Sequence, residues 1–196
     1  MEIMKTTMKR NILAIVLFVA TIGYANTDTK NFTANAKRVK LEFSSVKKGH
    51  SVQIIDEKGI VIYFEKIQIT GDFSKTFDLT ALENGTFTAE LDKDFEIIVK
   101  PFTVKNGTVT FLSESEKTIF KPIIRVDDNK VFLSKYNFEN DKLDIKIYFE
   151  NNLIHTETLE GKNSLNRIYS LSKVEKGSYT VSVNANDRSY SKKFNL

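Results

Sequence analysis

The strongest constraint on the fold is a stretch of sequence that occurs twice, 92 residues apart. Residues 77–87 read FDLTALENGTF and residues 169–179 read YSLSKVEKGSY. The identical positions in the two copies are Leu79 and Leu171, Glu83 and Glu175, and Gly85 and Gly177. A match of this extent at a fixed period indicates two copies of one folding unit.

Each copy is predicted to form a corner between two strands. The glycine of each copy follows a polar residue at a point where the chain must turn, so we expect a positive φ at Gly85 and Gly177. Apolar and polar residues alternate after each glycine, as is typical of a half-buried antiparallel strand. The inward residues of these strands are Phe87, Ala89 and Leu91 in the first copy and Tyr179, Val181 and Val183 in the second.

An aromatic residue opens the strand after each glycine. This arrangement resembles the E–F corner of immunoglobulin-like sandwiches, in which a tyrosine hydroxyl bonds back to the backbone. Tyr179 has the hydroxyl for that bond, whereas Phe87 can only pack. The structural corner residues predicted from the repeat are Leu79, Gly85, Phe87, Leu171, Gly177 and Tyr179.

The N-terminal residues have the pattern of a secretory signal peptide. Basic residues precede an apolar run from Ile12 to Ile22, and Gly23 and Ala25 suit a cut before Asn26. The apolar run is short for a membrane span, although an uncleaved N-terminal anchor is the alternative. The true start could be Met1, Met4 or Met8.

Length and repeat together favour two domains in the 196 residues. The predicted segments are a signal peptide (1–25), a flexible mature N-terminus (26–37), a first sandwich (38–112), a linker (113–118) and a second sandwich (119–196). The absence of Cys excludes disulfides, thiolate metal sites, cysteine nucleophiles and a lipid-modified cysteine. Cleavage would leave 26 basic and 24 acidic residues of the 29 and 25 in the full chain, a balance that gives no case for nucleic-acid binding.

The remaining sequence reads as short strands separated by turns. Asn106-Gly107 predicts a tight hairpin, and Pro101 within residues 95–104 predicts an edge strand or a bulge. No window after the signal peptide has convincing helical periodicity. We therefore predict an all-β protein of two tandem immunoglobulin-like antiparallel β-sandwich domains.

Residues 145–196 resemble the C-terminal sorting domain of cargo for the type IX secretion system of Bacteroidetes. The resemblance rests on the strands at 145–148 and 153–154, on Ser170-Leu171-Ser172 and Gly177-Ser178-Tyr179, and on Lys192-Lys193-Phe194. Residues 52–104 match the same scheme. The Tyr-Pro-Asn-Pro opening of those domains is absent, so the resemblance implies the shared sandwich architecture and a secreted protein of that phylum.

Histidines and acidic turns are the candidate metal or acid–base residues. His50 is predicted in a loop and His155 in a strand, and a shared role would need them to meet across domains. The turns Asp127-Asp128-Asn129 and Asp92-Lys93-Asp94 could supply calcium ligands, but such residues are also ordinary in hairpin loops. We predict no metal, no cofactor and no catalytic residues.

Adjacent aromatic residues are the candidate binding residues. In a pair of directly adjacent residues, one side chain must face outward if the other faces inward, and an outward set could bind a carbohydrate or a peptide. The residues considered are Tyr63, Phe64, Tyr136, Phe138, Tyr148 and Phe149.

No nucleophile elbow, phosphate loop or dinucleotide motif is present. A pair of carboxylates meeting in a cleft, as in a small extracellular hydrolase, is a further alternative. The preferred hypothesis is an exported, non-enzymatic binding or structural protein with an unknown protein or glycan partner. The alternative is type IX cargo, or a component of that system, whose second unit is the sorting signal.

Overall fold

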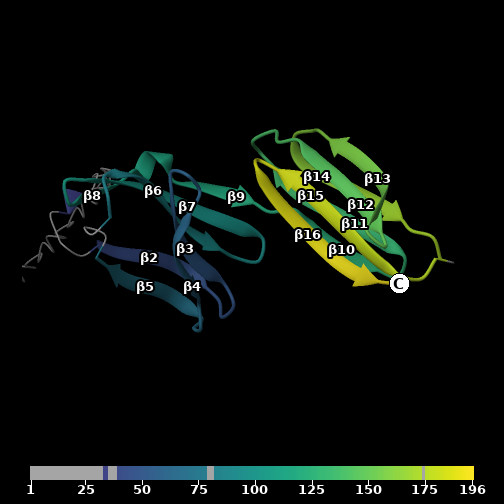
Figure 1. Cartoon of the computed structure of the whole chain (residues 1–196), viewed down its shortest axis with the longest axis horizontal. Helices are drawn as coiled ribbons and strands as arrows, with labels where there is room; N and C mark the ends of the chain where they lie inside the picture. The colour runs from purple at the N-terminus through teal and green to yellow at the C-terminus, as the bar shows by residue number, and fades with distance from the viewer. Residues whose placement is uncertain (1–32, 35–38, 79–81, 174) are drawn as a thin grey trace, which may run out of the picture.

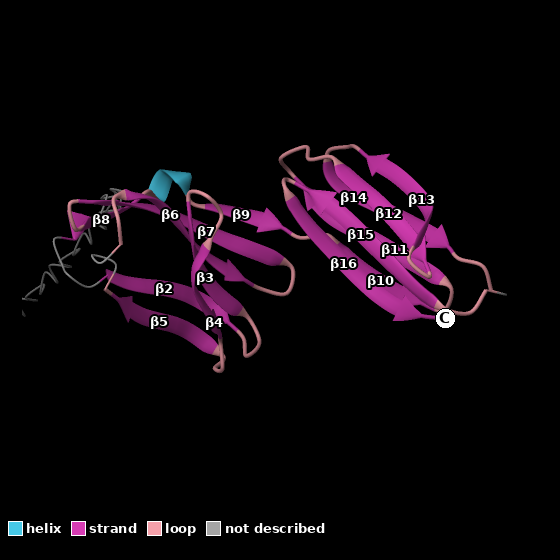
Figure 2. Ribbon diagram, viewed as in Figure 1, coloured by secondary structure: helices cyan, strands magenta, loops and turns pink. Residues whose placement is uncertain are grey.

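The computed structural model describes residues 33–34, 39–78, 82–173 and 175–196, which form two lobes joined by a short connection (Figure 1). The predicted signal peptide and the corner residue Leu79 lie outside the described residues. The described residues form antiparallel strands apart from turns and one short 3-10 helix (Figure 2), so the all-β sandwich prediction is confirmed.

The first lobe contains two antiparallel sheets that enclose one apolar core. The smaller sheet pairs β2 (Val39–Val46) with β5 (Gly71–Phe77). The larger sheet has the order β1 (Thr33–Ala34), β8 (Thr108–Phe111), β7 (Glu96–Lys105), β6 (Gly85–Asp92), β3 (Ser51–Asp56) and β4 (Val61–Lys66), and β9 (Lys117–Phe120) also pairs with β7. The largest fully buried core side chains come from facing strands of both sheets and include Phe102, Ile54, Leu91 and Val46.

The second lobe has the same two-sheet construction around a second core. One sheet has the order β10 (Ile123–Asp127), β11 (Lys130–Asn137) and β14 (Asn163–Ser170). The other has the order β13 (Asn152–Leu159), β12 (Leu143–Phe149), β15 (Ser178–Ala185) and β16 (Arg188–Asn195).

Strand pairing shows that the sequence repeat extends over six strands of each lobe. Val39 pairs with Phe77 and Val131 with Tyr169, each member 92 residues later. Between β3 and β12 the spacing of matching residues is one larger than 92, because the loop before β12 is one residue longer than the loop before β3. The β-bulge between Ile54 and Ile55 consequently recurs between Ile147 and Tyr148.

The connection between the lobes begins with strand β9. The segment predicted as a linker, 113–118, contains a 3-10 turn (Ser113–Ser115) and the start of β9, which pairs with β7 from Glu96↔Phe120 to Val99↔Lys117. The change from the first lobe to the second therefore lies at Lys121-Pro122, between β9 and β10.

Pro101 is neither on an edge strand nor at a bulge, so that prediction is wrong. Strand β7 pairs with β6 along one side and with β8 and then β9 along the other. The carbonyl of Pro101 accepts a hydrogen bond from Leu112 N at 2.9 Å. Since N and C=O of one strand residue point the same way, the missing N–H lies on the side where β8 gives way to β9 and no partner is needed.

The corner glycines differ from each other. The expected positive φ at Gly85 is wrong: it opens β6 as ordinary strand, and an added Cβ would meet only the Phe87 ring at 3.7 Å. At Gly177 the expected positive φ is confirmed, with φ at +158°, and an added Cβ would lie 2.5 Å from Glu150 Oε1 and 2.8 Å from the Phe149 ring. A side chain therefore has no room at Gly177, whereas the surroundings of Gly85 leave room for one.

The aromatic residues of the two corners are both buried. The Tyr179 hydroxyl donates to the carbonyl of Glu175 at 3.3 Å, and its ring packs on Phe149. Phe87 stacks on Phe102 in the first core. Leu171 donates its N–H to the carbonyl of Asn129 at 2.8 Å and packs against the second core.

Candidate functional site

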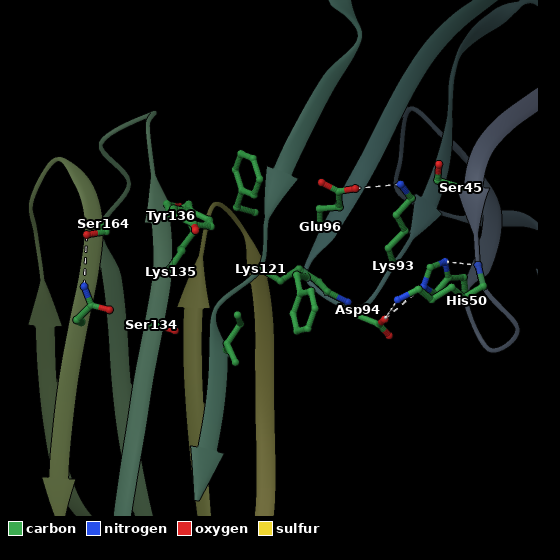
Figure 3. Close-up of a pocket in the computed structure, with 15 residues that line it drawn as sticks. Ser45, His50, Lys93, Asp94, Glu96, Lys121, Ser134, Lys135, Tyr136 and Ser164 are labelled. Carbon is green, nitrogen blue, oxygen red and sulfur yellow. Dashed lines mark hydrogen bonds and ion pairs between the residues drawn. The ribbon is translucent and has the colours of Figure 1, made fainter. Parts of the chain in front are cut away.

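A cleft of about 780 Å³ lies where the two lobes meet (Figure 3). One wall comes from the loops that precede β3 and β7 in the first lobe. The other comes from β11 and β14 in the second, with the connecting segment between them. None of the described corner residues lines it.

Three aromatic rings form a cluster beside this cleft, which we call the aromatic cluster: Phe120, Tyr136 and Phe138. Tyr136 and Phe138 are stacked, with centroids 5.9 Å apart and planes 6° apart. Phe120 meets both edge-on, at 5.6 Å and 5.7 Å. Tyr136 and Phe138 remain 61% and 63% exposed, so the rings contact one another while offering large apolar surface to a ligand.

Strand alternation explains the direction of these side chains. The odd-numbered residues of β11 from Val131 to Asn137 are buried, so the even-numbered Ser134 and Tyr136 lie on the outer face of the sheet. Phe138 follows on the same side, and β9 brings in Phe120 from the first lobe.

Neutral polar side chains lie next to the aromatic cluster on the outer face of the sheet formed by β11 and β14. Ser164 lies opposite Tyr136, and Asn166 lies opposite Ser134. The Asn166 amide donates to the Ser164 hydroxyl at 3.3 Å (Figure 3). These side chains both donate and accept hydrogen bonds.

The lysines that line the cleft are paired with carboxylates. Lys93 Nζ lies 3.0 Å from Glu96, and Lys121 Nζ lies 2.6 Å from Asp92. Lys135 Nζ lies 2.7 Å from Asp141, while Lys47 Nζ is 3.9 Å from Asp94. Both walls of the cleft therefore carry charged side chains, but each lysine is neutralised by a neighbouring carboxylate.

His50 closes the end of the cleft opposite Tyr136 (Figure 3). Its Nδ1 accepts the N–H of Lys47 at 3.0 Å, which leaves the proton on Nε2. Nε2 is buried, lies 3.6 Å from Asp94 Oδ2 and has no hydrogen-bond partner. The ring thus faces the carboxylate of Asp94 across a gap longer than a hydrogen bond.

An ion pair away from the cleft also joins the two lobes. Arg188, at the start of β16, reaches Glu90 on β6 through both of its terminal nitrogens, with Nη1 donating to Oε2 at 3.3 Å. Glu90 is buried and also accepts from Gln53 Nε2 at 2.9 Å. A bidentate pair to a buried carboxylate therefore joins the two lobes in a defined geometry.

The ion pair of Lys135 and Asp141 supports the strand that carries Tyr136. Although burial alone would raise the pKa of Asp141, hydrogen bonds from Lys135 and Asn186 hold it below its usual value. Asn137, fully buried, adds hydrogen bonds to the backbone of Asp141 and to the carbonyl of Gly161 at 2.6 Å. The turn after β11 is therefore tied to two other loops.

The other predicted candidates lie away from the cleft or serve as turns. His155 sits on β13 near Glu157 and does not meet His50. Asp127 pairs with Arg125, and the Asn129 amide donates to the carbonyl of Leu171. Among the described residues no group of three His, Asp or Glu could hold a metal ion.

The remaining aromatic pairs are divided between surface and core. Phe64 is 61% exposed on edge strand β4, whereas Tyr63 packs edge-on against Phe77. Phe149 packs on Tyr179. Sequence reasoning placed Tyr136 and Phe138 among the candidates but missed Phe120, whose segment has no counterpart in the first copy.

Comparisons with known proteins add little. No family model and no curated protein matches the chain. Among solved structures it is similar to one described as "Biofilm associated protein - BSP domain", at 13% identity and a TM-score of 0.27, over 80% of this chain and 27% of that one. The chain spans about a quarter of that structure's length, and a TM-score this low does not indicate a shared fold. No helix in the part of the chain that the structure describes is long and apolar enough to cross a membrane.

Proposed function

We propose that this chain is an exported, non-enzymatic binding protein whose ligand lies in the cleft between the lobes. The aromatic cluster carries the proposal, because two exposed rings are stacked where a cleft with neutral polar side chains begins. Apolar surface beside a few convergent polar groups is the usual composition of a binding site.

Comparison of the two copies supports a role for these rings beyond folding. The residue 92 positions before Tyr136 is Ser44, exposed on β2. The folding unit therefore does not require an aromatic residue there, and the second copy carries one at the mouth of the cleft.

Binding of purified protein to a cell-surface extract of the source bacterium tests the proposal. Tyr136→Ala should weaken retention on the immobilised extract by about tenfold, since a stacked aromatic contributes on the order of 1–2 kcal/mol to an interface. Phe64→Ala is the matched control, because that ring is equally exposed but lies on β4. Equal loss in both variants, or no retention of the wild type, would contradict the proposal.

A type IX cargo, or a component of that system, whose second unit is a sorting signal is the second candidate. The resemblance of residues 145–196 to such domains favours it, whereas the interlobe pair of Arg188 and Glu90 favours a unit that is kept. An epitope inserted at the Asp127-Asp128-Asn129 turn should remain on the mature chain if the second lobe is retained. Loss of the tag after export, with a chain ending near Glu116, would establish the sorting signal instead.

A further inference from the structure

We infer that the ligand of the cleft is a neutral carbohydrate chain, stacked on Tyr136 and Phe138 and hydrogen-bonded by Ser134, Ser164 and Asn166. This inference rests on the proposed function. It adds the chemical class of the ligand, which three independent observations specify.

The first observation is the pairing of every lysine that lines the cleft. Each has a carboxylate within 4.0 Å, and the closest pairs lie at 2.6 Å and 2.7 Å. A phosphate, sulfate or carboxylate ligand would compete with these acids and leave one of them without its cation. A ligand without charge leaves all four pairs intact.

The second observation is the kind of polar group beside the rings. Ser134, Ser164 and Asn166 occupy adjacent outward positions on β11 and β14. Hydroxyl and amide groups donate and accept, and sugar hydroxyls have the same dual character. The C–H faces of a sugar ring in turn suit the exposed faces of Tyr136 and Phe138.

The third observation excludes strand addition as the mode of binding at this face. Strand β11 is paired with β14 from Lys130 to Asn137 and with β10 from Lys130 to Ser134. Ladder hydrogen bonds lie in the plane of the sheet, so a peptide lying over Tyr136 on the outer face could not obtain the main-chain hydrogen bonds that recognition of an extended peptide relies on. A ligand here meets side chains only.

The size of the cleft suits a chain of several sugar units. The cleft runs from Tyr136 to His50 and Asp94 (Figure 3), and its volume of about 780 Å³ exceeds what one sugar ring would fill. The carboxylate of Asp94 is 55% exposed and faces His50 and Lys47. It can accept hydroxyl hydrogens from the far end of the chain.

The test treats the immobilised cell-surface extract in two ways before the full-length protein is applied. Periodate cleaves vicinal diols and should abolish retention of the wild type, whereas proteinase K should leave it unchanged. Raising the salt concentration from about 0.05 M to about 0.5 M should also leave retention within twofold, because no screened charge holds the ligand. Asn166→Ala should weaken retention several-fold, and Asn152→Ala, an exposed change on β13, should not.

Each contrary result is distinct. Loss of retention after proteinase K but not after periodate would replace the carbohydrate with a protein and leave the proposed function standing. A loss of tenfold or more at high salt would show a charged ligand and overturn the neutral assignment. Failure of the wild type to bind untreated extract would remove the proposed function and this inference together.

Discussion

Gly85 and Gly177 hold the same position in the two copies, yet only Gly177 lacks room for a side chain. The cause is the residue at the end of the neighbouring strand. Phe149 ends β12 and lies against Gly177, while the corresponding residue at the end of β3 is Asp56, whose carboxylate accepts from the N–H groups of Lys58 and Ile60 instead.

Substitution of the two glycines should therefore have unequal effects. Gly177→Ala should lower the free energy of unfolding by about 1–3 kcal/mol, because the added methyl overlaps a packed ring. Gly85→Ala should change it by less than about 0.5 kcal/mol. Urea unfolding of the two variants measures the difference, and equal losses would show that the Phe149 contact is not the cause.

A buried ion pair makes a second prediction at this scale. Lys135 and Asp141 have side chains only 4% and 9% exposed, and Asp141→Asn removes one charge while leaving the other buried. The variant should lose about 3 kcal/mol of stability at neutral pH. Glu160→Gln, which breaks the exposed pair with Lys142, is the control and should have little effect.

The loss in Asp141→Asn should depend on pH in one direction. The pKa of Asp141 is below its usual value in the folded protein, so its carboxylate stabilises the fold above the unfolded pKa of about 3.9 and ceases to do so as the pH falls through the folded value. The difference between wild type and variant should be largest near pH 7 and shrink below about pH 4. A difference that stays constant from pH 7 to pH 3 would contradict this account.

The edge strands of both sandwiches carry the same polar cluster, which connects one sheet to the other. In the first lobe Glu65 on β4 binds Lys75 on β5, and Tyr63 donates to the same carboxylate. In the second lobe Glu157 on β13 binds Arg167 on β14, with Nε donating at 3.0 Å. Glu65 and Lys75 lie 92 positions before Glu157 and Arg167, so the repeat preserves the ion pair between the sheets as well as the corner.

The two clusters should differ in strength. Arg167 binds Glu157 through two nitrogens, and that carboxylate is 22% exposed, whereas Glu65 is 35% exposed and meets one ammonium. Hydrogen bonds from Lys75 and Tyr63 nevertheless hold the pKa of Glu65 below its usual value. A double-mutant cycle on Glu157 and Arg167 should give a coupling of about 0.5–1 kcal/mol, and the cycle on Glu65 and Lys75 a smaller one. A larger coupling in the first lobe would refute this ranking.

Strands could be predicted from the sequence where the pattern that indicates them lies within the strand itself. Alternation identified the strands after Gly85 and Gly177, and the repeat identified two sandwiches. The pairing of β9 with β7 could not be foreseen, because residues 117–120 pair with residues 96–99 across the intervening hairpin of β7 and β8. The aromatic cluster depends on that pairing, since β9 brings Phe120 to Tyr136.

Arg188 on β16 and Glu90 on β6 form an ion pair between the lobes that lies outside both cores. Arg188→Gln should loosen the lobes, so small-angle scattering should give a larger radius of gyration than that of the wild type. The double variant with Glu90→Gln removes the buried charge and should recover thermal stability without recovering the compact arrangement. Arg125→Gln is the control, since its pair with Asp127 is exposed on a hairpin. An unchanged scattering curve for Arg188→Gln would show that other contacts hold the lobes.

Strand β9 also decides how the molecule responds to mechanical load. Tension that draws the lobes apart passes through residues 117–122 and is resisted by the four-residue ladder to β7 and by the pair of Arg188 and Glu90. We expect these contacts to break before either core is exposed, so that the released strand lengthens the molecule by roughly 3.3–3.6 Å per residue. Phe120 would then leave the aromatic cluster while both sandwiches stay folded.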